Sequence, residues 1–183
     1  MGLKKYIGDK AFYRRLLSVA IPIMIQNGVT QLVSLVDNVM VGTLGTESMS
    51  GVSIVNQFVF VFTVLIFGTA SAAGIFTAQY HGNGDTEGIR HTFRFKLIIN
   101  LLAGVIGVLV FIFFGDALIN SFIHSGSDTG DPALTFAEGK RYLLIMVFTL
   151  VPYAFGQVYA TTMRETGQVF IPMLASVAAV FNH

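Results

Sequence analysis

The sequence contains no cysteine and no tryptophan, and only 11% of its 183 residues are charged. Without cysteine the chain can form no disulfide framework and no thiolate metal site. Soluble domains carry about 25% charged residues, so less than half of the usual charge is present to keep a surface in water. The net charge of +1 gives no excess of positive charge that would indicate a nucleic-acid partner. Together with a mean hydropathy of +0.71, this composition indicates a membrane protein.

The uncharged stretches of the sequence are long enough to cross a bilayer. A spanning helix needs about 20 mostly apolar residues to cross a hydrocarbon core that is ~30 Å thick. The sequence holds uncharged windows of 21 residues after Arg15, 37 after Glu47, 19 after Lys96, 22 after Arg141 and 18 from Thr166 to His183. We therefore predict an all-α, polytopic bundle with helices near 16–42, 51–79, 95–115, 142–162 and 169–183. Residues 1–15 are expected to form an amphipathic lead-in, 16–183 the bundle, and 115–141 a long polar loop.

The basic residues are distributed unevenly between the two ends of the predicted helices. Nine of the 11 lie on the same side as the N-terminus, and only Lys140 and Arg141 lie on the other side. Because cytoplasmic segments retain positive charge, the N-terminus is expected to be cytoplasmic. A cleaved signal peptide is the rival interpretation, but its apolar core is about 7–15 residues long, shorter than the run found here.

The first predicted helix carries a polar face. With ~100° of rotation per residue, its polar side chains fall within an arc of about 140°. They are Gln26, Asn27, Thr30, Gln31, Ser34, Asp37 and Asn38. Lipid cannot satisfy such groups, so we predict that this face forms the wall of a cavity, with hydrogen bonding between helices as the alternative. Val29 and Leu32 belong to the apolar remainder of the helix.

Asp37 is the residue of the sequence that most specifically indicates a functional site. An acid inside a spanning segment indicates a functional site, because such a group can take up a proton or bind a cation. The alternative is positional: Asp37 lies five residues before Gly42, about 7–8 Å from the helix end, where interfacial water can solvate it.

Other polar residues and prolines lie inside the predicted spans. Asn56 and Gln57 in the second helix, and Tyr153 and Gln157 in the fourth, are predicted to form either further cavity wall or packing seams. The third helix offers only Asn100, so it is expected to be the most lipid-exposed. Proline lacks a backbone donor and bends helices, which indicates kinks at the prolines within or near the spans. These are Pro22, Pro152 and Pro172.

Motifs for enzymatic chemistry are lacking. The four histidines are scattered without a pair at ligand spacing on one helix face. Asp128 and Asp131 do not match the ligand spacing of a calcium loop. The sequence contains no nucleophile elbow, zinc motif or dinucleotide fingerprint. We expect no catalytic residues, no resident metal and no cofactor.

Three ordered motifs resemble a known family. Pro22 is followed fifteen residues later by Asp37, within a segment that ends in a Gly-x-x-Gly turn at Gly42 and Gly45. The small-residue run 68–79 precedes a Gly-x-Gly-Asp turn, and Arg164-Glu165-Thr166-Gly167 precedes Pro172. This order is similar to that of the multidrug and toxic compound extrusion (MATE) transporters.

The resemblance implies a fold and a function. MATE transporters are twelve-helix antiporters of two six-helix lobes, which exchange H⁺ or Na⁺ for organic cations and lipophilic drugs. It implies that Asp37 takes up the coupling cation, that Asn182 partners it, and that Pro22 is the hinge at which the first helix bends. The chain would be a fragment that holds part of the N-lobe, with the remaining half of the transporter as its partner. A bacterial cytoplasmic membrane is the expected location.

Two other functions stay open at this point. One is a lipid-linked saccharide flippase of the related superfamily, which would need a basic cavity for a pyrophosphate headgroup. The other is a non-transporting membrane subunit, whose polar stripes would be partner interfaces. The only charged residue expected well inside a span is acidic, which favours cationic substrates.

Overall fold

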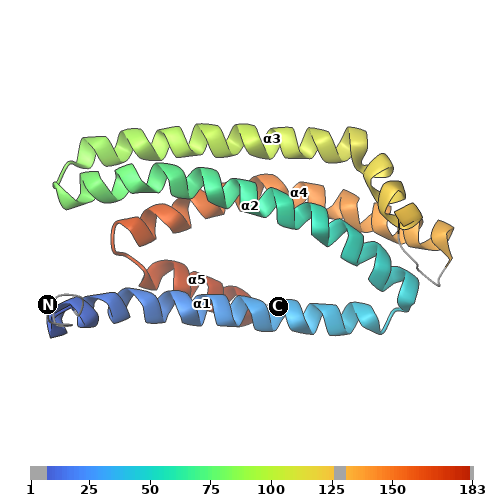
Figure 1. Cartoon of the computed structure of the whole chain (residues 1–183), viewed down its shortest axis with the longest axis horizontal. Helices are drawn as coiled ribbons and strands as arrows, with labels where there is room; N and C mark the ends of the chain where they lie inside the picture. Colours follow the sequence, from blue (N-terminus) through green and yellow to red (C-terminus); the bar gives the residue numbers. More distant parts are fainter. Residues whose placement is uncertain (1–7, 126–130, 182–183) are drawn as a thin grey trace, which may run out of the picture.

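The computed structural model describes residues 8–125 and 131–181, and these residues form five helices without a strand (Figure 1). The helices are α1 (Lys10–Gly42), α2 (Thr46–Gly82), α3 (Thr86–Ser125), α4 (Pro132–Glu165) and α5 (Phe170–Phe181). The first four are long and apolar enough to cross a membrane, whereas α5 has 12 residues. The all-α, polytopic fold predicted from the sequence is confirmed.

The helices extend beyond the predicted spans. α3 has 40 residues, which corresponds to about 60 Å and is twice the thickness of a hydrocarbon core. The prediction of a long polar loop over 115–141 was wrong, because α3 continues through Gly115 to Ser125 and α4 begins at Pro132. Charge-free windows reveal only the part of a helix inside lipid. Beyond their apolar parts, α3 and α4 are joined by an ion pair, with Lys140 Nζ 2.6 Å from Asp116 Oδ2.

Aspartates cap three of the helices. Side-chain oxygens of Asp9, Asp85 and Asp131 accept hydrogen bonds of 2.7–3.0 Å from backbone amides in the first turns of α1, α3 and α4. A side-chain acceptor at this position satisfies amides that have no partner inside the helix. Asp131 therefore has a structural role, and Asp128 lies outside the described residues. α1 begins at Lys10, so the second half of the predicted lead-in is continuous with the first span.

The helices are arranged in two layers. α2, α3 and α4 form a close-packed bundle, and α1 and α5 pair beside it (Figure 1). The apolar core of the bundle lies between α2, α3 and α4 and includes Val55, Phe62, Ile66, Phe111, Ile119, Leu143, Leu150 and Ala154. α2 and α4 approach closely where two glycines meet, since a Cβ added to Gly51 would lie 2.7 Å from the backbone nitrogen of Gly139. Small residues permit such close crossings in membranes.

Within the described part of the chain, the third helix is more buried than α1, although its few polar residues indicated that it would be the most exposed. Its polar residues Thr92, Lys96 and Asn100 are buried against the rest of the bundle. Of the residues of α1, by contrast, only Pro22 is buried. A low content of polar residues does not reveal that α3 packs against both α2 and α4. α1 continues through Pro22 as a single helix, and the hinge role of this proline stays a prediction.

Candidate functional site: a cavity between the two helix layers

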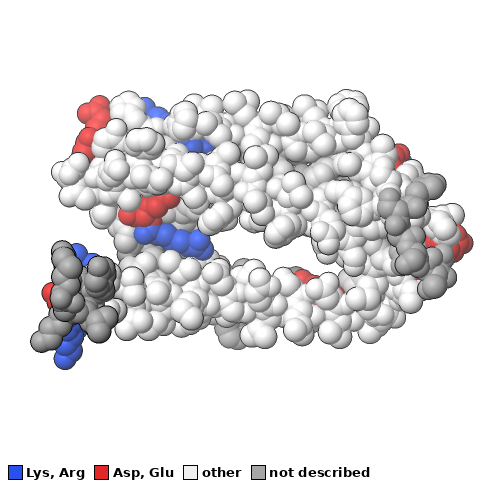
Figure 2. Space-filling view, viewed as in Figure 1, with Lys and Arg blue, Asp and Glu red and all other residues white. Residues whose placement is uncertain are grey.

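A cavity of about 1300 Å³ lies between the α1 layer and the α2–α4 bundle. Figure 2 shows it as a hollow beside the C-terminal half of α1. It is open because α1 touches α2 only lightly along this stretch, while α2 and α4 pack closely against each other. α1 supplies most of its wall, and α2, α4 and α5 supply the rest. Its lining includes Val29, Val33, Ser34, Asp37, Asn38, Met40, Leu44, Val52, Asn56, Tyr142, Val177 and Val180.

The polar groups of the cavity gather around Asp37. Ser34 and Asn38 accompany Asp37 on α1, and Asn56 and Tyr142 face the same space from α2 and α4. The Tyr142 hydroxyl donates a hydrogen bond of 3.2 Å to Asn56 Oδ1. Among the described residues of the lining, Asp37 is the only charged one. A carboxylate beside hydroxyl and amide oxygens in an otherwise apolar wall suits a cation that carries apolar groups.

The structure divides the residues predicted for the cavity. Ser34, Asp37, Asn38 and Asn56 line it, whereas the others lie outside this lining; these are Gln26, Asn27, Thr30, Gln31, Gln57, Tyr153 and Gln157. The hydroxyl of Thr30 donates to the carbonyl of Gln26 at 3.0 Å, so it is satisfied within its own helix. Asn182, the proposed partner of Asp37, lies outside the described residues.

The apolar part of α1 also faces the cavity, contrary to expectation. Val29 and Leu32 belong to the lining together with the polar residues. Helical periodicity predicts which side chains share a face, but it does not predict how far open space extends around a lightly packed helix. The wall therefore contains both polar and apolar side chains. Its tyrosine, Tyr142, was not predicted as a site residue, because it is the first residue of the predicted fourth helix, directly after the predicted loop.

Gln26 joins helices rather than facing the cavity. Its Nε2 donates to Ser176 Oγ at 2.8 Å and to the Pro172 carbonyl at 3.3 Å, both on α5. Its Oε1 accepts a hydrogen bond of 2.7 Å from Arg164 Nη2 at the end of α4. This geometry matches the alternative interpretation, in which amide side chains hydrogen-bond across a bundle.

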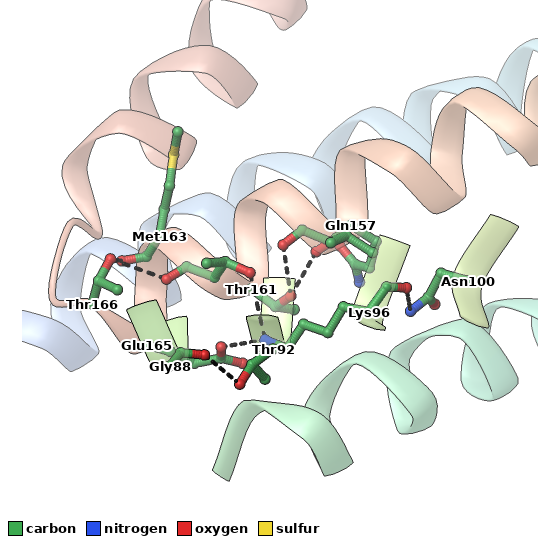
Figure 3. A network of polar contacts seen from close by, with 11 residues as sticks. Gly88, Thr92, Lys96, Asn100, Gln157, Thr161, Met163, Glu165 and Thr166 are labelled. Carbon is green, nitrogen blue, oxygen red and sulfur yellow. Dashed lines mark hydrogen bonds and ion pairs between the residues drawn. The ribbon is translucent and has the colours of Figure 1, made fainter. Parts of the chain in front are cut away.

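A buried ion pair was missed entirely. The side chain of Lys96 on α3 is fully buried and pairs with Glu165 in the last turn of α4, whose side chain is 17% exposed (Figure 3). The hydroxyl of Thr162 lies 3.4 Å from Lys96 Nζ. The sequence placed Lys96 at a helix end, but α3 begins ten residues earlier, about 15 Å away along the axis. Asp37 is thus not the only charged residue inside a span.

The buried lysine belongs to a polar stripe on α3. Thr92, Lys96 and Asn100 follow one another at steps of four and point into the bundle (Figure 3). Asn100 Nδ2 donates to the Lys96 carbonyl at 2.9 Å, and its Oδ1 accepts from the Thr69 hydroxyl at 3.1 Å. Each member therefore has a partner, as buried polar groups require. The even spacing of three polar residues is the sequence signal that would have located this stripe.

Cysteine labelling tests whether the cavity holds water. The chain contains no cysteine, so one introduced thiol gives an unambiguous signal. We expect a cysteine at Ser34, which lines the cavity, to react with a water-soluble maleimide in membrane vesicles. A cysteine at the neighbouring Leu35, which is exposed and outside the lining, should stay unmodified because we expect lipid to cover this apolar position. Equal labelling of the two variants would contradict a water-filled cavity.

Comparison with known proteins gives consistent matches. The model of the MatE family matches residues 22–183. "Probable multidrug resistance protein NorM" of Thermotoga maritima is 23% identical over 89% of this chain and 34% of its own length. "Probable multidrug resistance protein YoeA" of Bacillus subtilis is 22% identical over 95% of this chain and 36% of its own length. "Multidrug resistance protein PmpM" of Pseudomonas aeruginosa is 31% identical over 57% of this chain and 23% of its own length. The chain thus spans about a third of the length of the first two relatives.

Proposed function

Because the chain belongs to the MATE family, we propose that it contributes the cavity-bearing part of a secondary active multidrug efflux transporter. The transporter exports organic cations and lipophilic drugs in exchange for H⁺ or Na⁺. The N-terminus of α1 lies at the cytoplasmic face of the membrane. The rest of the transporter completes the path.

The observation that carries this proposal is the position of Asp37 in the wall of the cavity. The volume of about 1300 Å³ exceeds the roughly 300–1,000 Å³ typical of sites for drug-sized ligands. Its walls are mainly aliphatic, with Val29, Val33 and Val177 among them, and offer apolar contact to a lipophilic substrate. Shape, apolar lining and one negative charge together favour organic cations.

A single carboxylate in the cavity provides a simple coupling device. Asp37 can hold a proton or Na⁺, or it can attract the positive charge of a drug, but one negative charge cannot neutralise both. Loading the coupling ion therefore weakens drug binding, and the drug weakens ion binding by the same factor. Ser34, Asn38 and Asn56 supply oxygen atoms near the same space for a bound ion.

The lining of the cavity also bears on the two alternatives. A flippase for a pyrophosphate headgroup needs basic side chains in the cavity, and the described lining contains none. The basic residues inside the fold, Lys96 and Arg164, contact Glu165 and Gln26 instead. In a non-transporting subunit the cavity would be an interface filled by a partner, and cysteines in its wall would be protected.

Replacing Asp37 with asparagine tests the proposal in the whole transporter. We expect export of a fluorescent organic cation to fall by about a hundredfold or more, because the variant keeps the shape of the side chain but loses the charge that couples ion and drug. Asp116→Asn is the matched control, since Asp116 forms a surface ion pair with Lys140. Efflux by the Asp37 variant at the level of the control would disprove the role of Asp37.

A further inference from the structure

The last turn of α4 sends two adjacent side chains in different directions. Arg164 reaches α1, where its Nη2 donates to Gln26 Oε1 at 2.7 Å. Glu165 reaches α3, where it pairs with the buried Lys96 (Figure 3). This turn therefore connects the α1 layer with the α2–α4 bundle, between which the cavity lies.

The contact between Arg164 and Gln26 lies directly beyond one end of the cavity. On α1 the lining begins at Val29, three residues after Gln26. On α5 it begins at Val177, next to Ser176, whose hydroxyl accepts a hydrogen bond from Gln26. The side chain of Gln26 thus crosses from α1 to α5 and to Arg164 where the cavity ends. The opposite end of the cavity is lined by the α1–α2 turn, including Leu44.

The two contacts of this turn differ in strength. Lys96 and Glu165 are oppositely charged and largely withdrawn from water, where removing either partner leaves an uncompensated charge. Arg164 meets a neutral amide instead, and its Nε is a buried atom without a hydrogen-bond partner among the described residues. The contact with Gln26 is therefore the weaker of the two.

We propose that Lys96 and Glu165 are positioning residues that hold the last turn of α4 so that Arg164 closes this end of the cavity against Gln26. The cavity opens at this end when the Arg164–Gln26 contact separates, while Glu165 stays bound to Lys96. The inference deepens the proposed function, since it takes the cavity to be the transport path. It also gives Glu165 a role at the C-terminal end of a helix, where a negative charge is otherwise unfavourable.

Gly74 on α2 gives a way to disturb the ion pair without changing any charge. A Cβ added to Gly74 would overlap the carboxylate of Glu165, and its three nearest atoms all belong to that carboxylate. Gly74→Ala therefore displaces the flexible end of Glu165 from Lys96 and leaves the backbone in place. Gly68 is the matched control on the same helix, because a Cβ there meets nothing within 4 Å.

The rate of labelling at Ser34→Cys reports whether this end of the cavity is open. A membrane-impermeant maleimide is applied to vesicles of the whole transporter from the side of the α2–α3 turn, which lies at the same end of the bundle as the C-terminal end of α4 (Figure 1). Gly74→Ala should raise the labelling rate about tenfold, which corresponds to a shift of about 1.4 kcal/mol in the opening equilibrium. Gln26→Leu should raise the rate similarly, and Gly68→Ala should leave it within about twofold.

Exchanging the two charges of the Lys96–Glu165 pair tests whether the ion pair itself keeps this end of the cavity closed. Lys96→Glu and Glu165→Lys should each raise the rate, and the double substitution should bring it back toward that of the unaltered pair. Unchanged labelling in both Gly74→Ala and Gln26→Leu would overturn the inference. The labelling does not depend on export, so a failure of the Asp37 test with increased labelling in Gly74→Ala would reject the proposed function and leave the closure standing.

Discussion

Replacing Lys96 with methionine should lower the free energy of unfolding by about 3–5 kcal/mol, because it removes one partner of a buried ion pair. The Glu165 side chain is only 17% exposed and would be left without its cation. Glu165→Gln should destabilise the protein to a similar extent by leaving the fully buried ammonium unpaired. Unfolding of the detergent-purified protein by heat or by SDS measures both changes.

A double substitution separates two contributions to the free energy of unfolding, that of the ion pair and that of the volume which its side chains fill. Lys96→Met combined with Glu165→Met should regain most of the lost stability, since apolar residues of similar volume commonly replace a buried pair without loss. Lys140→Met is the surface control, because Lys140 and Asp116 are 44% and 57% exposed. Exposed pairs contribute about 0–1 kcal/mol. A loss in Lys96→Met no larger than in Lys140→Met would show that the interior pair is solvated.

The second large effect is expected at the crossing of α2 and α4. Gly51→Val should destabilise the bundle by about 3 kcal/mol, the upper part of the usual range for overpacking. A Cβ at Gly51 would lie 2.7 Å from the Gly139 nitrogen and 2.8 Å from the Thr135 carbonyl oxygen. Both are backbone atoms, so no side-chain rotation relieves the clash and the helices must separate.

Separation of α2 and α4 should also change the wall of the cavity. Tyr142 follows Gly139 by three residues and bonds to Asn56, five residues after Gly51, so both ends of this hydrogen bond move with the crossing. Gly68→Val is the control, because a Cβ at Gly68 meets nothing within 4 Å. The measurements are the unfolding midpoint of each variant and the labelling rate of the Ser34→Cys thiol. Equal midpoints for the two valine variants would be inconsistent with the close crossing.

Much of the fold follows from local properties of the sequence. In lipid each backbone amide must find its hydrogen-bond partner within the protein, so an apolar window of about 20 residues is expected to form a helix. The uncharged windows therefore predicted the spans, and the glycine-containing turns at Gly42–Gly45 and Gly82–Asp85 separated them. The predicted end of the third helix and start of the fourth were wrong, because α3 and α4 continue past their apolar parts. There they are stabilised by Asp131 and the Asp116–Lys140 pair.

The candidate site was predicted in part. The polar periodicity of α1 identified Ser34, Asp37 and Asn38, and Asn56 was found on the facing helix. Periodicity could not separate these residues from Gln26, because both kinds share a face of α1. Which of them meets open space and which meets α5 depends on where the neighbouring helices lie.

A bundle of membrane helices with an acid on the polar face of the first one could be predicted from the order of residues alone. Charge content and helical periodicity suffice for that, because both act over a few residues. The packing of the helices was needed to show that Lys96 pairs with Glu165 and that Gln26 contacts Arg164, residues separated by 69 and 138 positions in the chain. Such contacts depend on how three helices pack together, and no local pattern of residues records that geometry.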